Sequence, residues 1–187
     1  MLRRFVVLSC CLLPLGCAGL APKIPDTARL APGALGTGAD PDVTAVNLAQ
    51  WAFADPSRTR GRPVESARAS AAMDYIAGAL YTSPRWANLS PLTKEQLLQG
   101  RVEVRQALGV VPGTASQLVV DRLTAAGNAL ASGDQGAAVR QLGPPVFASS
   151  GEQVLARLGN MPYLRMANVA TMRVGNELFE TDSDEWH

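Results

Sequence analysis

Apolar residues recur at helical spacing through most of the chain beyond residue 40. The clearest stripe has intervals of four, three and four residues and consists of Val119, Leu123, Ala126 and Leu130. Similar stripes run through residues 69–80 and 164–178. No comparable stretch shows the period of two expected of a half-buried strand. The pattern predicts an all-α fold.

Local sequence signals mark where these helices begin. A hydroxyl residue followed three positions later by glutamine is typical of a helix N-terminus, and this pattern starts at Thr93, Thr114 and Ser150. Proline in the first turn offers further starts at Pro41 and Pro63. With Pro and Gly marking the loops, we expect helices at 41–54, 63–82, 93–109, 114–132, 135–142, 151–159 and 162–179. Short loops between them predict a compact bundle of about six to seven antiparallel helices.

Residues 1–16 have the pattern of a signal peptide. Arg3 and Arg4 precede an apolar run of about eleven residues. That run is too short to cross a bilayer as a helix, which takes about twenty residues. We therefore expect the segment to direct export and then to be removed.

The end of this segment, Leu15-Gly16-Cys17, resembles the lipobox of bacterial lipoproteins. The resemblance implies that Cys17 receives lipid and becomes the first residue of the mature chain. It also implies sorting to the outer membrane, because Ala18 follows the cysteine. Pro14 departs from the leucine that is usual at its position. The alternative is an ordinary secretory signal, cleaved after a small residue such as Ala21, with Cys17 discarded.

Composition divides the exported part into three regions. Residues 17–40 are rich in Pro, Gly and Ala and poor in large apolar residues, which predicts a flexible tether behind the lipid. Residues 41–180 carry the helical pattern and form the expected domain. Residues 181–187 are an acidic tail that we expect to be frayed.

The residue types present limit the available chemistry. The only histidine is the terminal His187, and all three cysteines lie within the first seventeen residues. The domain therefore lacks a histidine base and a cysteine metal site, and we expect no catalytic residue, metal or cofactor. We expect a solvated or helix-capping role for the scattered carboxylates Asp74, Glu95, Glu103, Asp121 and Glu152.

The charge balance argues against nucleic-acid binding. The chain has 17 basic and 16 acidic residues, and two of the basic ones lie in the signal segment. A nucleic-acid interface needs a basic face that displaces counterions. The short run Arg58, Arg60 and Arg62 is interpreted as a solvated loop.

Two tryptophans are candidates for binding a partner. Trp86 lies in a loop next to Pro84 and Arg85, where it could be an exposed anchor or could fold back onto the core. Trp186 lies in the acidic tail, whose charge could steer it toward a basic surface.

These features favour a membrane-anchored envelope lipoprotein facing the periplasm, which acts as a non-enzymatic helical module for protein interaction or assembly. One alternative is a bundle that binds a small apolar ligand, lined by Met161, Met166 and Met172. A second is a carboxylate-based envelope enzyme. An exposed apolar groove would favour the first function, a closed cavity the second, and two carboxylates meeting in a cleft the third.

Overall fold

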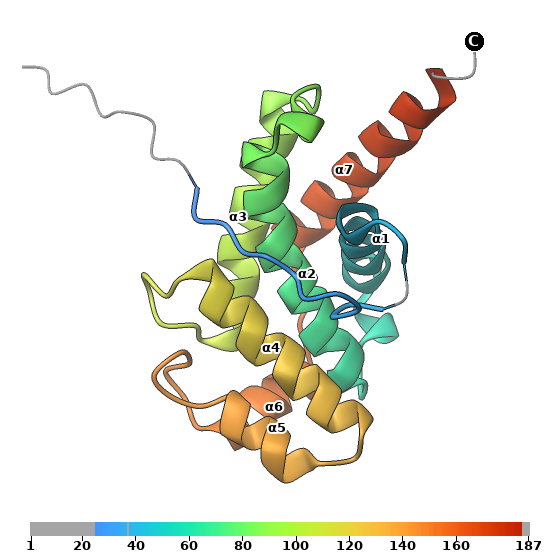
Figure 1. Ribbon diagram of the computed structural model, residues 1–187. Helices are drawn as coiled ribbons and strands as arrows, with labels where there is room; N and C mark the ends of the chain where they lie inside the picture. Colours follow the sequence, from blue (N-terminus) through green and yellow to red (C-terminus); the bar gives the residue numbers. More distant parts are fainter. Residues whose placement is uncertain (1–24, 37, 185–187) are drawn as a thin grey trace, which may run out of the picture.

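The computed structural model describes residues 25–36 and 38–184, with side chains described up to residue 178 (Figure 1). The helices in this part of the chain are α1 (Pro41–Ala54), η1 (Pro56–Arg58), α2 (Pro63–Thr82), η2 (Pro84–Trp86), α3 (Pro91–Leu108), α4 (Ser116–Ala131), α5 (Gln135–Gln141), α6 (Gly151–Gly159) and α7 (Arg165–Asp184). The described residues contain no strand longer than an isolated bridge between Val110 and Phe147. The predicted all-α fold is confirmed, and each predicted helix corresponds to an observed one.

Helix α2 lies at the centre of the bundle. It contacts α1, α3, α4 and α6, and 13 of its 20 residues are buried. Alanine supplies many of these positions, so the neighbouring helices can approach closely on several sides. A helix that is apolar around most of its circumference has to occupy such an interior position.

Side-chain caps confirm two of the predicted helix starts. The carboxylate of Asp40 accepts the backbone amides of Asp42 and Val43 at the start of α1. The hydroxyl of Ser150 accepts the amide of Gln153 at the start of α6, at 3.5 Å. These caps satisfy amides that have no partner within the helix.

Two other predicted caps are wrong. Helix α3 is capped by Ser90 rather than Thr93, since the Ser90 hydroxyl accepts the amide of Thr93 at 3.1 Å. Thr114 does not cap α4. Instead, the amide of Ser116 donates to the carboxylate of Asp26 at 2.6 Å, so a residue 90 positions upstream takes the place of a local cap.

Asp26 belongs to an extended segment, residues 25–36, that we call the N-terminal strap. It crosses over α2 toward the start of α1 (Figure 1). Its buried side chains are Ala28, Ala34 and Leu35. A Cβ atom at Gly78 of α2 would lie 2.5 Å from the carbonyl oxygen of Asp26, so the strap can cross there only because α2 has a glycine.

The strap corrects the predicted flexible tether, which extended to residue 40. The Gln117 side chain exchanges hydrogen bonds with the backbone of Arg29, at 2.8 and 3.0 Å. Arg101 also donates to the carbonyl of Asp26 at 2.8 Å. Small apolar side chains and partners on α3 and α4 hold the segment in place, although its composition alone cannot build a core. Residues 17–24 of the predicted tether lie outside the described residues.

Helices α3 and α7 run antiparallel and cap each other. The carboxylate of Glu103, near the end of α3, accepts the amides of Met166 and Ala167 at the start of α7. Glu177 of α7 in turn accepts hydrogen bonds from Ser90 and Thr93 at the start of α3. Each helix thereby supplies a negative charge to the positive N-terminal end of its neighbour.

Candidate functional site

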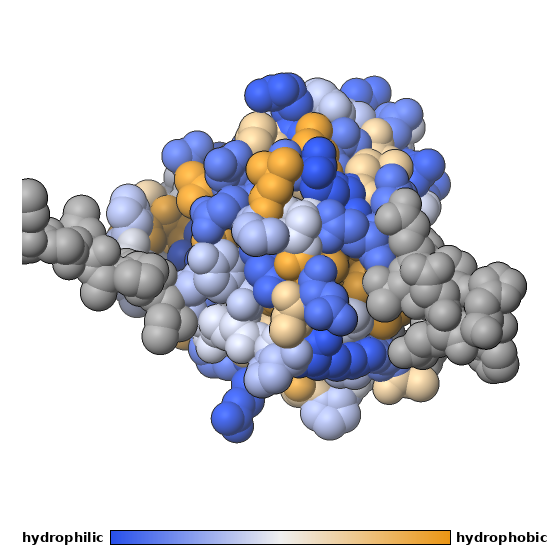
Figure 2. Space-filling view, turned by 90° about the horizontal axis from the view of Figure 1, so that it is seen from above, coloured by the Kyte–Doolittle hydropathy of each residue, from blue (hydrophilic) through white to orange (hydrophobic). Residues whose placement is uncertain are grey.

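Exposed apolar side chains are spread over the bundle rather than gathered on one face. The large ones are Trp51, Leu92, Val102, Leu118, Tyr163 and Met172. The view in Figure 2 shows hydrophobic patches separated by hydrophilic residues. Single exposed apolar residues are normal on a protein surface, so a binding site needs a groove that joins several of them. Two grooves flank α7: one joins the exposed Val102 to the half-buried Leu98 and Met166, and the other joins Trp51 and Met172.

The first is the α3–α7 groove, an open hollow of about 450 Å³ between these helices. It is lined by Leu98, Gln99, Val102, Glu103, Gln106 and Met166. Val102 is 51% exposed, although it lies on a helix whose opposite face supplies core residues such as Leu97 and Val104. The groove exposes mostly apolar surface.

Close packing of the two backbones shapes this groove. At Gly100, an added Cβ would lie 2.7 Å from the terminal methyl of Met73 and 3.1 Å from the Cα of Ala167. The helices can approach this closely only because α3 has a glycine at that position. Beside this contact, Glu103 is engaged by the amides of α7 at 2.7 and 2.9 Å, so its carboxylate is used within the fold.

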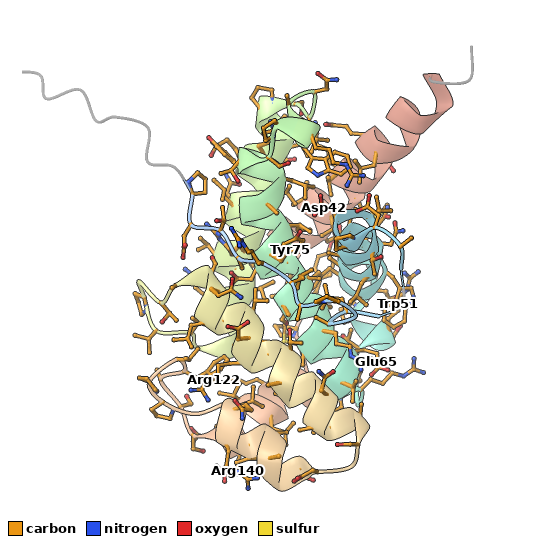
Figure 3. All side chains as sticks on the ribbon, viewed as in Figure 1. Asp42, Trp51, Glu65, Tyr75, Arg122 and Arg140 are labelled. Atoms are coloured by element: carbon orange, nitrogen blue, oxygen red, sulfur yellow. The ribbon has the colours of Figure 1, made fainter. Side chains whose placement is uncertain are left out.

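The second is the α1–α7 groove, an open hollow of about 330 Å³ lined by Asn47, Gln50, Trp51, Ala54, Arg58 and Met172. Trp51, near the end of α1, lies at the outer side of the bundle (Figure 3). The guanidinium of Arg58 donates to the carbonyl of Trp51 at 2.9 Å, which places a positive charge at the C-terminal end of α1. This groove therefore combines an aromatic ring, a thioether and a cation.

Trp86, a predicted anchor, is half-buried and packs against the hydrophobic core. Its indole nitrogen donates to the carboxylate of Asp42 at 2.7 Å, and the guanidinium of Arg85 lies 4.4 Å from the ring centroid. These contacts favour the interpretation in which Trp86 folds back and joins η2 to the start of α1.

The other oxygen of Asp42 accepts a hydrogen bond from the hydroxyl of Tyr75 at 2.5 Å (Figure 3). Burial, followed by this hydrogen bond, raises the pKa of Tyr75 above its ordinary value, so the phenol stays a neutral donor. A hydrogen bond from Arg85 lowers the pKa of Asp40 and keeps it ionised. The polar side chains around Asp42 are therefore hydrogen-bonded to one another and hold η2 against α1 and α2.

Asp74 contradicts the expectation of a solvated or capping carboxylate. It is 2% exposed, and Arg105 of α3 binds both of its oxygens at 2.6 and 2.8 Å. Arg105 also donates to the carbonyl of Thr114 and the hydroxyl of Ser116, both at 2.9 Å. Because α2 is enclosed by its neighbours, a polar position on this helix also lies inside the bundle and requires a partner.

The other carboxylates are spread over separate places. Glu103 has the capping role that was expected, although it caps α7 rather than its own helix. Glu95 accepts from the hydroxyl of Tyr81, and Asp121 from the amide of Gln117, both at exposed sites. Glu152 lies in the first turn of α6. The α3–α7 groove contains one carboxylate and the α1–α7 groove contains none.

The three methionines proposed as a ligand lining do not share a cavity in the described structure. Met161 is buried, Met166 lines the α3–α7 groove, and Met172 lines the α1–α7 groove. Sequence reasoning missed the groove residues Leu98 and Val102. The available signal was an apolar residue, Val102, on the outward face of α3.

The lipidation site Cys17 and the tail residue Trp186 lie outside the described residues. No helix in the described part of the chain is long and apolar enough to cross a membrane. Comparison with protein-family models, curated proteins and solved structures finds no match for this chain.

Proposed function

We propose that this chain is a membrane-anchored envelope lipoprotein whose helical domain binds another envelope protein without catalysing a reaction. The observation that carries the proposal is the open, largely apolar α3–α7 groove. Apolar surface that is continuous and accessible favours a macromolecular partner. The outer membrane, with the domain facing the periplasm, is the proposed location, based on Cys17 and Ala18.

The chemistry of this groove fits the apolar face of an amphipathic helix. Leu98 and Val102 are one helical turn apart on α3, so they present a ridge to a second helix. Met166 can adapt its shape to the inserted side chains, because its thioether side chain is flexible. Gln99 and Gln106 offer neutral hydrogen-bonding groups, while the carboxylate of Glu103 is engaged by α7. We therefore expect the inserted face of the partner to be uncharged.

The same geometry argues for this function over the two alternatives. A small apolar ligand is held best by an enclosed cavity, whereas both grooves are open. A carboxylate mechanism needs two carboxyl groups that face one substrate. Neither groove provides such a pair.

The strap would keep the domain close to the bilayer. Its contacts with α3 and α4 include those of Asp26, and eight residues lie between Cys17 and Asp26 in the sequence. Eight residues span at most about 28 Å when fully extended. A partner of the α3–α7 groove should therefore also lie near the membrane surface.

The groove is tested by capture from detergent-solubilised envelope with the mature chain as bait. Val102→Asp places a charge in the groove at a side chain that is 51% exposed, so the fold should be retained. We expect this variant to lose at least tenfold in partner recovery. Leu118→Asp is the matched control, because Leu118 is an exposed apolar residue on α4, outside the groove. Equal recovery by both variants, with circular dichroism unchanged, would contradict the proposed docking site.

The lipid anchor is tested separately by metabolic labelling with a fatty acid. Cys17→Ser removes the thiol that the resemblance identifies as the acceptor. We expect the label to disappear while the helical domain still folds. Label that persists on the Cys17→Ser chain would exclude Cys17 as the site of lipid attachment.

A further inference from the structure

The N-terminal strap contributes little to the hydrophobic core. Its buried side chains are the two alanines Ala28 and Ala34 and one larger residue, Leu35. In the described structure, the backbone–backbone hydrogen bonds of the strap join its own residues 31–36 to one another, and none joins it to a helix. A hollow of about 230 Å³ remains between the strap and α4. The strap therefore lies on the bundle with little burial of its own.

A few polar contacts hold the strap in place, and most of them lie near the surface. The hydrogen bonds between Gln117 and the backbone of Arg29 are exposed, as is the bond from Arg101 to the carbonyl of Asp26. The bond from the amide of Ser116 to the carboxylate of Asp26 is partly buried. Segments with few buried apolar contacts and exposed hydrogen bonds open more readily than a core does. We therefore expect the strap to leave the bundle at a lower cost than global unfolding.

The helices beneath the strap contact one another without it. Helix α2 packs directly against α1, α3 and α4. The buried pair of Asp74 and Arg105 joins α2 to α3, and Arg105 also donates to the hydroxyl of Ser116 at the start of α4. Arg101 donates to the same hydroxyl at 3.1 Å. Release of the strap would expose the amide of Ser116, which water can then satisfy. These contacts allow the bundle to stay folded when the strap is released.

Release would lengthen the link between the domain and the proposed lipid on Cys17. With the strap docked, the link ends at Asp26 and spans at most about 28 Å. With the strap released, residues 18–40 all precede α1 and span at most about 80 Å. Their Pro, Gly and Ala content is typical of a flexible link. The same segment can therefore form a short link or a long one.

We propose that the strap is a releasable part of the tether, and that its docking controls how far the domain reaches from the membrane. The docked strap holds the α3–α7 groove near the bilayer. The released strap lets the groove reach a partner that lies farther from the membrane surface. This inference rests on the proposed lipid anchor, but docking and release can be measured on the mature chain without lipid.

Native-state hydrogen exchange tests release in the mature chain. The amide of Arg29 donates to Gln117 and that of Ser116 donates to Asp26, so both report on docking. We expect these two amides to exchange at least a hundredfold faster than that of Val120, a buried residue inside α4, and at rates that low urea does not change. Protection and urea dependence equal to those of Val120 would show that the strap opens only with the whole bundle, and would overturn the proposal.

A matched pair of glycine variants tests whether the bundle needs the strap. Gly78→Ala brings a Cβ to 2.5 Å from the carbonyl oxygen of Asp26, which pushes the strap off α2 while favouring the helix. We expect exchange at Arg29 and Ser116 to rise at least tenfold and the bundle to stay folded by circular dichroism. The control is Gly127→Ala on α4, whose Cβ would have ordinary contacts of 3.4 Å or more. Equal exchange in the two variants, or an unfolded bundle in Gly78→Ala alone, would contradict a releasable strap.

A second variant releases the strap without a steric clash. Gln117→Ala removes both hydrogen bonds to the backbone of Arg29 and places a good helix former on α4. We expect exchange at Ser116 to rise at least threefold, although Ser116 itself is unchanged. An unchanged exchange rate at Ser116 would show that these contacts do not hold the strap.

Energy transfer to a labelled membrane tests the change in reach. The mature chain has one cysteine, Cys17, which can be coupled to a maleimide lipid in phosphatidylcholine vesicles with dansyl-labelled headgroups. We expect transfer from the tryptophans to dansyl to be lower for Gly78→Ala than for wild type and Gly127→Ala, because a longer link lets the domain move away. Chemical coupling supplies the anchor, so this result does not depend on lipid attachment in the cell. Equal transfer for all three chains would contradict control of reach by the strap.

Discussion

The two grooves beside α7 differ in chemistry although they share a helix. On the α3 side, Leu98, Val102 and Met166 present apolar surface, and the carboxylate of Glu103 is engaged within the fold. On the α1 side, Trp51 and Arg58 combine an aromatic ring with a positive charge. One helix can therefore separate two binding chemistries by placing them on opposite flanks. The α3–α7 groove suits a neutral helix, whereas the α1–α7 groove also offers a cation.

The two flanks also differ in how they are fixed. Reciprocal glutamate caps and the backbone contact at Gly100 hold α3 against α7. On the α1 side, the atoms nearest to an added Cβ at Gly175 belong to the side-chain amide of Gln50, 2.6 Å away. A flexible side chain can move where a backbone cannot. We therefore expect a preformed groove on the α3 side and an adaptable one on the α1 side.

The largest expected effect comes from removing Asp74, the buried partner of Arg105 on α3. Asp74→Ala leaves the guanidinium without its carboxylate, and we expect a loss of about 3 kcal/mol or more in the free energy of unfolding. Urea unfolding of the mature chain measures it. The matched control Asp121→Ala removes an exposed carboxylate and should change stability by less than about 0.5 kcal/mol. A similar loss of stability in both variants would contradict a stabilising role for the buried pair of Asp74 and Arg105.

Removing the cap that α3 supplies to α7 should have the next largest effect. Glu103→Ala deletes two hydrogen bonds from backbone amides to a carboxylate, and we expect a loss of about 2 kcal/mol. Hydrogen exchange should increase at the start of α7. Glu95→Ala, on the same helix, removes only an exposed contact to Tyr81 and serves as the control. Unchanged exchange at Met166 and Ala167 would refute the capping role.

A pair of glycine substitutions compares the two flanks directly. Gly100→Ala pushes against the backbone of Ala167, so despite a gain in helix propensity of about 1 kcal/mol we expect a net loss of about 1 kcal/mol. The nearest obstacle to Gly175→Ala is the flexible side chain of Gln50, so this variant should be neutral or stabilising. Thermal unfolding of the two variants measures the difference. The reverse order of stability would show that the α1 flank is the tighter one.

The smallest expected effect is a pH dependence of stability that comes from Glu177. Burial acts to raise its pKa, but hydrogen bonds from Thr93 and Ser90 outweigh burial, and the pKa lies below its ordinary value of 4.5. A carboxyl group whose pKa is lower in the folded than in the unfolded chain stabilises the fold at pH values above the unfolded pKa. This stabilisation is lost as the pH falls through the folded pKa. Glu177→Gln should therefore be less stable than wild type at pH 7 and should approach it in acid. A stability difference that does not change between pH 7 and acid would contradict this assignment.

Much of the helical fold follows from local sequence signals. Asp40-Pro41, Pro63 and Ser150 mark starts that the structure confirms, because their caps and ring geometry act within one turn. The wrong predictions concern helix starts where a residue distant in the sequence accepts the free amides in place of a local cap. Asp26 caps α4 from 90 residues upstream, so the Thr114 signal gave the wrong cap. No local pattern identifies such partners.

The candidate site was less predictable for the same reason. The sequence leaves open whether Trp86 is an exposed anchor or folds back onto the core, and the hydrogen bond from its indole nitrogen to Asp42 of α1 favours the second. Asp74 looks like a surface carboxylate until α2 proves to be enclosed by its neighbours. The grooves depend on how α7 packs between α1 and α3. Sequence periodicity identifies faces of helices, but it does not show which helices become neighbours.

The most direct test of the account places one photo-crosslinking residue in the α3–α7 groove and one outside it, in living cells. The account predicts that a probe at Val102 links the chain to another envelope protein. A probe at Leu118, which is exposed on α4 outside the groove, should not link it to that protein. Mass spectrometry of the adducts identifies the partner. Self-adducts from Val102, or the same foreign protein from both positions, would contradict the assignment of the partner to this groove.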